Sequence, residues 1–155
     1  MKKPVIAIVG ATGAVGAEFV GCLTERDFPV GTLKALASAR SVGKTLEFRG
    51  DVIHVEELME RSFEGVDIAL FSAGASVSRK FAPSAVKAGA VVVDNSSAFR
   101  MAGDVPLVIP EINARRIAEH KGIIANPNCS AITALVPLWP IHKKNRIKRM
   151  IISTY

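Results

Sequence analysis

The chain has few cysteines and lacks an apolar run long enough to cross a membrane. Its 155 residues include two cysteines, Cys22 and Cys129, too few for a disulfide framework or a cysteine metal cluster. A membrane helix needs about 20 consecutive apolar residues. The apolar run after Lys2 and Lys3 is short and leads into a glycine turn, unlike a signal peptide. These absences predict a protein of the reducing cytoplasm with neither a membrane partner nor a metal site.

Acidic and aromatic residues are also scarce. The chain has 20 Lys and Arg against 14 Asp and Glu, which gives a net charge of +6, and only 6% of its residues are aromatic. Much of the excess charge lies in the basic run 142–149. Nucleic-acid sites usually add interleaved aromatic residues or a base-reading motif, and this run has neither. We therefore interpret it as a solvated helix end and expect no nucleic-acid partner.

What the sequence does contain is an alternation of apolar runs with helical patterns. Strands are predicted at 4–9, 33–37, 66–71, 90–93 and 122–125, with a further one from 149 to 155 and a short hairpin or irregular extension over 45–55. Helices are predicted after the first strand, from Ser76 or Ser78 to Lys87, from Asn113 to about His120, and from Ser130 to His142. This alternation predicts an α/β fold with a doubly wound, mostly parallel sheet of Rossmann type.

Prolines interrupt two of these helical patterns. Pro83 lies inside the pattern that ends at Lys87, and Pro137 and Pro140 lie inside the pattern that starts at Ser130. Proline removes a backbone donor and collides with the preceding turn. We therefore expect a kink, a restart or an early end in both helices.

A glycine-rich turn follows the first strand. Gly10, Gly13 and Gly16 are spaced three residues apart at the start of a helical pattern. In such a turn the first glycine lets the chain leave the strand, the second lets the backbone approach a pyrophosphate, and the third lets the helix pack close to the sheet. Thr12 adds a hydroxyl that can reach the phosphate. This turn predicts a dinucleotide-binding site.

The end of the second strand indicates which dinucleotide binds. An NAD site usually has Asp or Glu about 20 residues after the turn, to hold the ribose 2′-hydroxyl. Here the strand runs into Ser38, Arg40 and Ser41, with no acid. A guanidinium and two hydroxyls suit a 2′-phosphate, which a carboxylate would repel. The sequence therefore predicts NADP rather than NAD, the alternative being that Arg40 is an ordinary surface arginine.

A cysteine begins the last helical pattern. Pro127 disfavours helix at Asn126, and Asn128 is a good N-cap, so Cys129 falls in the first helical turn. The helix dipole and free N–H groups there favour an anion, which suits a reactive thiolate. The alternative is a small buried cysteine behind an N-cap.

Several polar loops should meet at one edge of the predicted sheet, because ligands of open α/β sheets bind at the carboxyl ends of the strands. They are the glycine turn, the segment Ser72-Ala73-Gly74, the loop from Asn95 to Arg100, and the pair Asn128 and Cys129. Arg100 offers a fork for a phosphate or carboxylate. A hydride acceptor, a thiol and an anion clamp together suit oxidation of an aldehyde through a thioester on the cysteine.

These motifs resemble aspartate-semialdehyde dehydrogenase. The resemblance is carried over essentially the whole chain by GATGAVG at 10–16, SARS at 38–41, FSAG at 71–74, DNSSAFR at 94–100, VIPEIN at 108–113 and NPNCS at 126–130. It implies a reversible, NADP-dependent conversion of aspartyl phosphate to aspartate semialdehyde, on the route to lysine, threonine and methionine. It also implies that Cys129 is the nucleophile, that Asn128 places the substrate carbonyl, and that Arg100 binds phosphate.

The same resemblance implies that residues 12–15, including Ala14 and Val15, and residues 40–41 hold NADP. Family members are considerably longer, and they form homodimers through a second domain. The resemblance implies that residues 1–130 form a dinucleotide-binding domain and that residues 131–155 begin a substrate and dimerisation domain. By the resemblance, the family's glutamine would come directly after Tyr155, and its histidine base and carboxylate-binding arginine further on. His54, His120 and His142 lie in contexts that do not match that base, and we interpret them as surface residues. Cys22 matches no catalytic position and is interpreted as structural.

We therefore expect the isolated chain to bind NADP with little turnover, and to self-associate through exposed apolar surface or to have limited stability. Two alternatives stay open. One is a cofactor-binding or regulatory module without chemistry of its own. The other is a related N-acetyl-glutamyl-phosphate reductase, whose motifs match less well.

Overall fold

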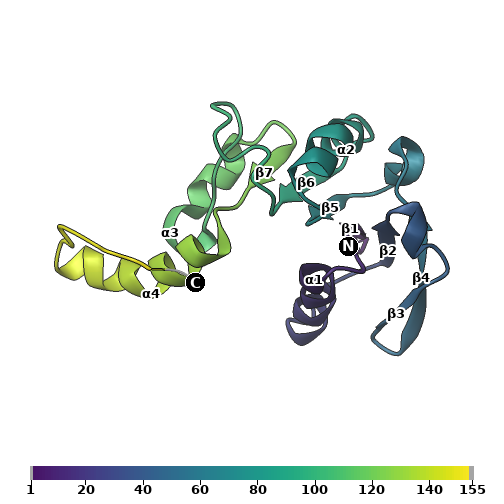
Figure 1. Cartoon of the computed structure of the whole chain (residues 1–155), viewed down its shortest axis with the longest axis horizontal. Helices are drawn as coiled ribbons and strands as arrows, with labels where there is room; N and C mark the ends of the chain where they lie inside the picture. The colour runs from purple at the N-terminus through teal and green to yellow at the C-terminus, as the bar shows by residue number, and fades with distance from the viewer. Residues whose placement is uncertain (1, 154–155) are drawn as a thin grey trace.

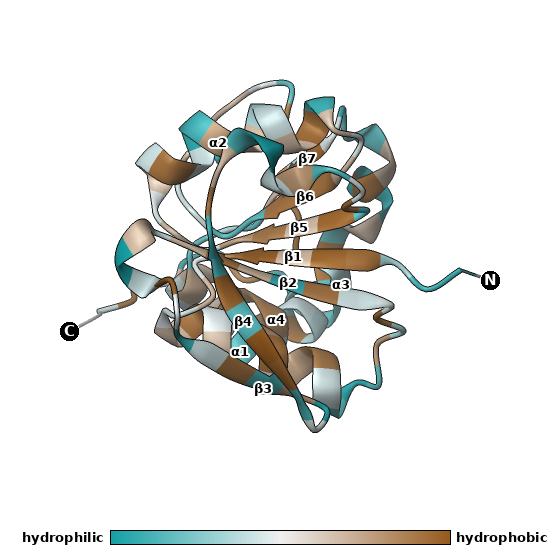
Figure 2. Cartoon of the chain, turned by 90° about the vertical axis from the view of Figure 1, so that its right-hand side faces the viewer, coloured by the Kyte–Doolittle hydropathy of each residue, from teal (hydrophilic) through white to brown (hydrophobic). Residues whose placement is uncertain are grey.

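A computed structural model describes residues 2–153, which form one seven-stranded sheet with helices on both faces (Figures 1 and 2). The strands are β1 (Val5–Val9), β2 (Thr32–Ala37), β3 (Thr45–Phe48), β4 (Asp51–Glu57), β5 (Ile68–Phe71), β6 (Val91–Asp94) and β7 (Ile123–Ala125). Their order is β3-β4-β2-β1-β5-β6-β7, and all neighbours are parallel except the β3–β4 hairpin. The predicted α/β fold with a mostly parallel sheet is confirmed.

The helices occupy the connections between strands. They are α1 (Ala14–Glu25), α2 (Ala75–Lys87), α3 (Pro110–Asn113) and α4 (Cys129–Lys144), with 3-10 segments η1 (Ala39–Ser41), η2 (Glu60–Phe63) and η3 (Ala114–Glu119). No helix within residues 2–153 has the length and apolar character needed to cross a bilayer.

Alternating side chains of the central strands form two cores, one on each face of the sheet. Ile6, Ile8 and Ala35 pack on the face that α1 covers, together with partly buried side chains of α1 such as Phe19. Val9 and Phe71 pack on the opposite face with Ala82 of α2. Figure 2 shows the two helices on opposite sides of the apolar strands. The near-continuous apolar runs read from the sequence are the ones that parallel strands buried on both faces require.

The order in which strands are added to the sheet reverses at β1, which pairs with β2 on one side and with β5 on the other. In open parallel sheets such a reversal leaves a crevice at the carboxyl ends of the strands. The loops after β1, β2 and β5 therefore diverge at one edge, and this edge contains most of the predicted site residues.

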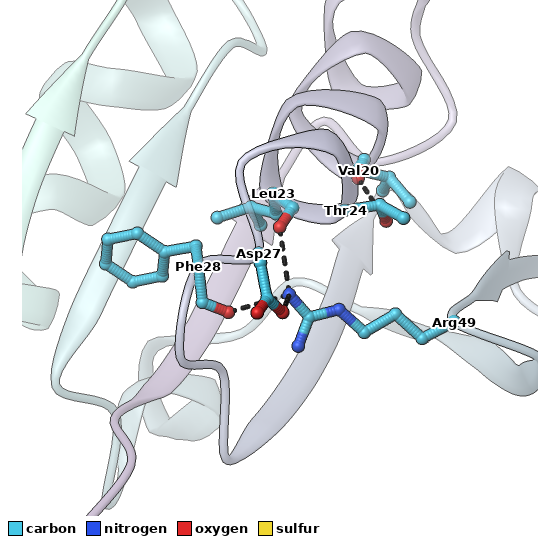
Figure 3. Close-up of polar contacts among 6 residues, drawn as sticks. All are labelled: Val20, Leu23, Thr24, Asp27, Phe28 and Arg49. Atoms are coloured by element: carbon cyan, nitrogen blue, oxygen red, sulfur yellow. Dashed lines mark hydrogen bonds and ion pairs between the residues drawn. The ribbon is translucent and has the colours of Figure 1, made fainter.

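The segment 45–55, predicted as a hairpin or irregular extension, is a regular hairpin that extends the sheet beyond β2. Arg49, at its tip, anchors it to the end of α1 (Figure 3). The Arg49 Nη2 donates to the carbonyls of Leu23, at 3.1 Å, and Phe28, at 2.9 Å, and lies 3.3 Å from an Asp27 carboxylate oxygen. These bonds add a side-chain donor to two carbonyls that already accept from the backbone N–H groups of Phe28 and Val30.

Helix starts were predicted less well than the helices themselves. Helix α2 begins after Gly74, whose φ is +87°, so neither Ser76 nor Ser78 is its cap. The Ser78 hydroxyl is buried and donates to the Asp94 carboxylate instead. The helix predicted from Asn113 to His120 is a single α-turn followed by a 3-10 segment. The Asn113 side chain folds back to bond Ile109 N and Leu107 O.

The prolines neither restart nor end these two helices. Helix α2 runs unbroken through Pro83, and α4 runs unbroken through Pro137 and Pro140 as far as Lys144. A proline costs a helix one hydrogen bond and strains one turn, and packing or capping can outweigh that cost. The strand predicted from Arg149 is wrong over residues 149–153, which form no strand, while Thr154 and Tyr155 lie outside the described residues.

Candidate functional site

A cleft of about 540 Å³ lies at the carboxyl edge of the sheet, between the loops that follow β1, β2, β4 and β5. Its walls combine polar loop residues with an apolar side from α2. The lining residues are Gly10, Thr12, Gly13, Ala37, Ser38, Ala39, Arg40, Glu57, Leu58, Ser72, Ala73, Val77 and Phe81. A cleft of this size and mixed lining is typical of a small-molecule or cofactor site.

The glycine turn forms the floor of this cleft. Gly10 has φ +89°, and a Cβ built there would lie 2.5 Å from the Ser72 carbonyl oxygen, so only glycine fits between these two loops. A Cβ on Gly16 would collide with Gly10 and Ala11, which places α1 directly against the turn. Gly13 is the N-cap of α1, and the first turn of that helix contains no acid. The turn therefore presents free N–H groups and a positive helix end to the cleft.

The loop after β2 provides the charge of the cleft. Arg40 lies in η1, is exposed and lines the cleft. Ser41 is buried instead, and its hydroxyl lies 3.2 Å from the Thr12 hydroxyl, so it ties this loop to the glycine turn. A positive helix end with a guanidinium on the adjacent loop can hold an anionic ligand such as a phosphate group.

Six lining residues were not among the predicted site residues; Ala37 and Ala39 flank the predicted Ser38, and four others come from different elements. Glu57 and Leu58 follow β4, and Val77 and Phe81 lie one turn apart on α2. Leu58, Val77 and Phe81 give the cleft an apolar wall that suits a flat base. The α2 pair follows directly from helical spacing after Ser72-Ala73-Gly74. Glu57 and Leu58 had no such signal, because the pairing of β4 with β2 was not predicted.

A line of polar side chains leads from the cleft along the ends of β5, β6 and β7. The Asn95 amide donates to the Ser72 hydroxyl at 3.3 Å, and the Asn126 amide donates to the Asn95 side-chain oxygen at 3.0 Å. The Asn126 Oδ1 is buried and has no hydrogen-bond partner among the described residues. This line connects three loops that are far apart in the sequence.

Arg100, in the loop that follows β6, bonds two residues of this line of polar side chains. Its Nε donates to the Asn126 carbonyl and its Nη2 to the Asn95 carbonyl, both at 2.9 Å. Guanidinium has five N–H donors, so these two bonds fix the side chain and leave others for a ligand. The arginine predicted to bind phosphate thus also holds together the ends of two strands.

Asp94 fixes the loop from within. The carboxylate is fully buried and accepts from the Ser78 hydroxyl and the Ser96 hydroxyl, each at 2.7 Å, and from the Ser96 N–H at 3.2 Å. These bonds join the end of β6, the loop and α2. The loop that positions Asn95 and Arg100 is therefore pinned at its base.

Cys129 is the first residue of α4 and is exposed. The Asn128 side chain accepts from the Ser130 N–H at 2.9 Å, which is the N-cap predicted from the sequence. Cys129 is three residues beyond Asn126, whose carbonyl Arg100 holds. Because Cys129 is exposed, the alternative interpretation of a small buried cysteine behind an N-cap is wrong. Cys22, interpreted as structural, is also exposed, on α1.

The predicted cofactor residues thus divide into two groups. Those in the cleft wall are Gly10, Thr12, Gly13, Ser38, Arg40, Ser72 and Ala73. Those outside it are Ala14, Val15, Gly16, Ser41, Gly74 and Asn95. Gly16, Ser41 and Asn95 nevertheless contact residues of the wall, as described above, whereas Gly74 starts α2. Arg100 lies outside the cleft and bonds Asn95 and Asn126 of the polar line, and Asn128 and Cys129 follow Asn126 closely in the chain.

Histidines take no part in this arrangement. The His120 Nδ1 accepts from Gly122 N–H and the His142 Nδ1 accepts from Ile147 N–H, so two residues predicted to be plain surface histidines are half-buried and bonded to backbone. Within residues 2–153, no hydrogen bond joins a histidine to Cys129 or to Asn128.

Comparison with known proteins identifies the fold and the family. Residues 5–120 match the family model described as semialdehyde dehydrogenase, NAD binding domain. The aspartate-semialdehyde dehydrogenase of Synechocystis sp. is 51% identical over 156 residues, which cover 100% of this chain and 46% of that protein. The chain therefore spans about half the length of the curated relatives it matches.

Solved structures of aspartate-semialdehyde dehydrogenases have a fold similar to that of this chain. A crystal structure of aspartate semialdehyde dehydrogenase II from Vibrio cholerae, complexed with ASA, is 52% identical with a TM-score of 0.87 and covers 91% of this chain and 47% of its own. The enzyme from Candida albicans, solved with NADP, is 27% identical with a TM-score of 0.70 and covers 93% of this chain and 48% of its own.

Proposed function

Because the chain belongs to the aspartate-semialdehyde dehydrogenase family and contains its NAD(P)-binding domain, we propose that it binds NADP and supplies the thiol nucleophile for interconversion of aspartate semialdehyde and aspartyl phosphate. That step serves the biosynthesis of lysine, threonine and methionine. The observation that carries the proposal is one edge of the sheet. There the glycine turn and Arg40 line one cleft, and hydrogen bonds link Ser72 through Asn95 to Asn126, three residues before Cys129.

The cofactor half of the proposal rests on the cleft. The free N–H groups at the start of α1 and the Thr12 hydroxyl would hold the pyrophosphate, and Arg40 and Ser38 would hold the 2′-phosphate. Val77 and Phe81 would pack on the adenine. NADP, when bound, accepts a hydride from the substrate in the oxidative direction. The ends of β5 and β6, where Ser72 and Asn95 lie, would receive the nicotinamide half.

The chemical half rests on Cys129. Its thiolate would attack the aldehyde carbon and form a C–S bond, which gives a thiohemiacetal on the cysteine. Departure of a hydride from that carbon and of the proton from its hydroxyl group would leave a thioester. Attack by phosphate then forms the C–O bond of the acyl phosphate, breaks the C–S bond and returns the electron pair to the thiolate. Asn128, which caps the same helix, would orient the substrate carbonyl.

Arg100 would hold the phosphate. Its guanidinium is fixed by the Asn95 and Asn126 carbonyls, and its remaining N–H groups are free of hydrogen bonds to the described residues. A side chain that is already held loses little entropy when it binds an anion. Because no described histidine is bonded to Cys129 or Asn128, we expect the proton transfers to be slow and turnover by this chain to be low.

The experiment has two parts, both on the 155-residue chain. Calorimetric titration should show NADP binding. Incubation with NADP+ and aspartate semialdehyde should then release no more than about one reduced cofactor per chain and leave an acyl adduct on Cys129, detected by intact-mass spectrometry. Cys129→Ser should lose the adduct and keep the binding.

A thiol comparison tests the rival interpretation, a binding module without chemistry. Cys22 and Cys129 are both exposed, so accessibility does not favour either one in alkylation by iodoacetamide. Cys129, at a helix start, should react several-fold faster than Cys22, which lies within α1. Equal rates, or an NADP complex that forms no adduct with aldehyde, would favour the binding module.

A further inference from the structure

We infer that Glu57 narrows the preference of the cleft for NADP over NAD, by placing a carboxylate where the adenosine ribose would lie. The inference rests on the proposed binding of NADP in this cleft. It also revises the sequence argument for NADP, which relied on the lack of an acid at the end of β2. The structure brings an acid to that place from a different strand.

Glu57 is the last residue of β4 and lies directly beside Ala37, the last residue of β2. Both residues line the cleft, together with Ser38 and Arg40 of the loop that follows β2. The end of β2 is the position from which dinucleotide-binding folds usually present the acid for the ribose 2′-hydroxyl. Glu57 is thus one strand further out and at the same level along the sheet.

The backbone around Glu57 is firmly held. The Leu58 N–H donates to the Ala37 carbonyl at 2.8 Å, and the Ser62 hydroxyl donates to the Glu57 carbonyl at 3.2 Å. The same hydroxyl accepts from the Met59 N–H at 3.0 Å. The side chain therefore extends from a fixed point at the cleft rather than from a mobile loop.

The two charges of the cleft do not neutralise each other. Ion pairs in the described part of the chain join Arg49 to Asp27 and Arg116 to Glu119, and neither Arg40 nor Glu57 takes part in one. Both side chains are exposed and line the same cleft. Each is therefore available to a ligand, with opposite preferences.

Those preferences concern one substituent of the ligand. The ribose 2′-hydroxyl of NAD donates a hydrogen bond that a carboxylate accepts, whereas the 2′-phosphate of NADP is an anion that a carboxylate repels. Arg40 has the reverse effect on the two cofactors. Arg40 thus favours NADP, Glu57 favours NAD, and their sum leaves a cleft that accepts both with a reduced margin for NADP.

The test compares dissociation constants of NADP and NAD, measured by calorimetry on the 155-residue chain, for the unmodified protein, Glu57→Gln and Glu57→Ser. Glu56→Gln is the matched control, because Glu56 is the preceding residue, is exposed and does not line the cleft. Both Glu57 variants should raise the affinity ratio of NADP to NAD about fivefold at low salt. The effect should shrink at high salt, because the interaction is a screened repulsion. Circular dichroism checks that each variant is folded.

The possible results distinguish failure of the inference on Glu57 from failure of the proposed function. An unchanged ratio with unchanged affinities would place Glu57 outside the ligand contacts, and an equal loss for both cofactors would assign it to the adenine. A lower ratio in the Glu57 variants would mean that Glu57 orients Arg40. Each of these three results overturns the inference. Failure of the unmodified chain to bind either cofactor would instead overturn the proposed function.

Discussion

At the scale of single residues, the buried Asp94 carboxylate depends on hydrogen bonds from its neighbours. It is fully buried and has three donors from Ser78 and Ser96, but no ion-pair partner among the described residues. A buried charge stays stable only while its hydrogen bonds are complete. The two serines therefore matter more to stability than their size suggests.

Removing the Ser78 hydroxyl should be costly. Ser78→Ala leaves one Asp94 oxygen with only the long bond from Ser96 N–H, so we expect a loss of about 1–3 kcal/mol in the free energy of unfolding. Urea unfolding followed by circular dichroism measures this. Ser76→Ala is the control, because Ser76 is exposed on the same helix, α2. Equal stability of the two variants would show that the Asp94 network contributes little.

Residue-scale prediction from the sequence worked where the chemistry is local. The glycine turn and the Asn128 cap of α4 depend on neighbours within one turn, and both lie in the structure as expected. Glu57 and Leu58 escaped, because they reach the cleft only through the pairing of β4 with β2. Arg100 was predicted as an anion clamp, but its bonds to the Asn95 and Asn126 carbonyls depend on two other loops.

At the scale of elements, the β3–β4 hairpin depends on one side chain at its tip. Arg49 has φ +55°, an unusual conformation for a residue other than glycine, and its guanidinium bonds two carbonyls at the end of α1 (Figure 3). Its ion pair with Asp27 adds little, because that carboxylate is 99% exposed. The hairpin is thus joined to α1 mainly through carbonyl contacts.

Two substitutions separate the contacts from the backbone conformation. Arg49→Ala should lower the free energy of unfolding by about 1–2 kcal/mol, because the carbonyl bonds are lost. Arg49→Gly loses the same bonds but suits the positive φ, so it should be the more stable of the two by up to about 1 kcal/mol. Thermal unfolding measures both, with Arg61→Ala, at an exposed arginine of η2, as the control. An Arg49→Ala variant as stable as this control would contradict the anchoring role.

At the scale of elements, the sequence predicted which strands and helices exist better than where each helix begins and ends. Strands β1, β2, β5, β6 and β7 lie close to the predicted ranges, because their apolar runs are uninterrupted. The expected restart at Pro83 and early end at Pro137 or Pro140 are absent, since local rules for proline do not include what the rest of a helix contributes. The start of α2 was misplaced because Gly74 adopts a conformation that composition alone does not reveal.

At the scale of the whole molecule, the fold class followed from the alternation of patterns, and exposed apolar surface was expected as well. Figure 1 shows α4 at the opposite end of the molecule from the β3–β4 hairpin. A groove of about 350 Å³ runs between this helix and the segment after it, lined by residues that include Leu138, Trp139 and Met150. Ile141, Ile151 and Ile152 are more than half exposed nearby. Apolar surface gathered in this way is characteristic of an interface.

We expect the 155-residue chain to self-associate through this end of the molecule. The net charge of +6 opposes association, so the effect should grow as salt screens the repulsion. Sedimentation velocity should show a weight-average mass that rises with protein and salt concentration. The double variant Ile141→Lys, Ile151→Lys should stay monomeric, whereas Val52→Lys, which adds charge to an exposed position on β4, should associate nearly as the unmodified chain does. A monomer at all concentrations, or equal suppression by the β4 variant, would contradict an interface at α4.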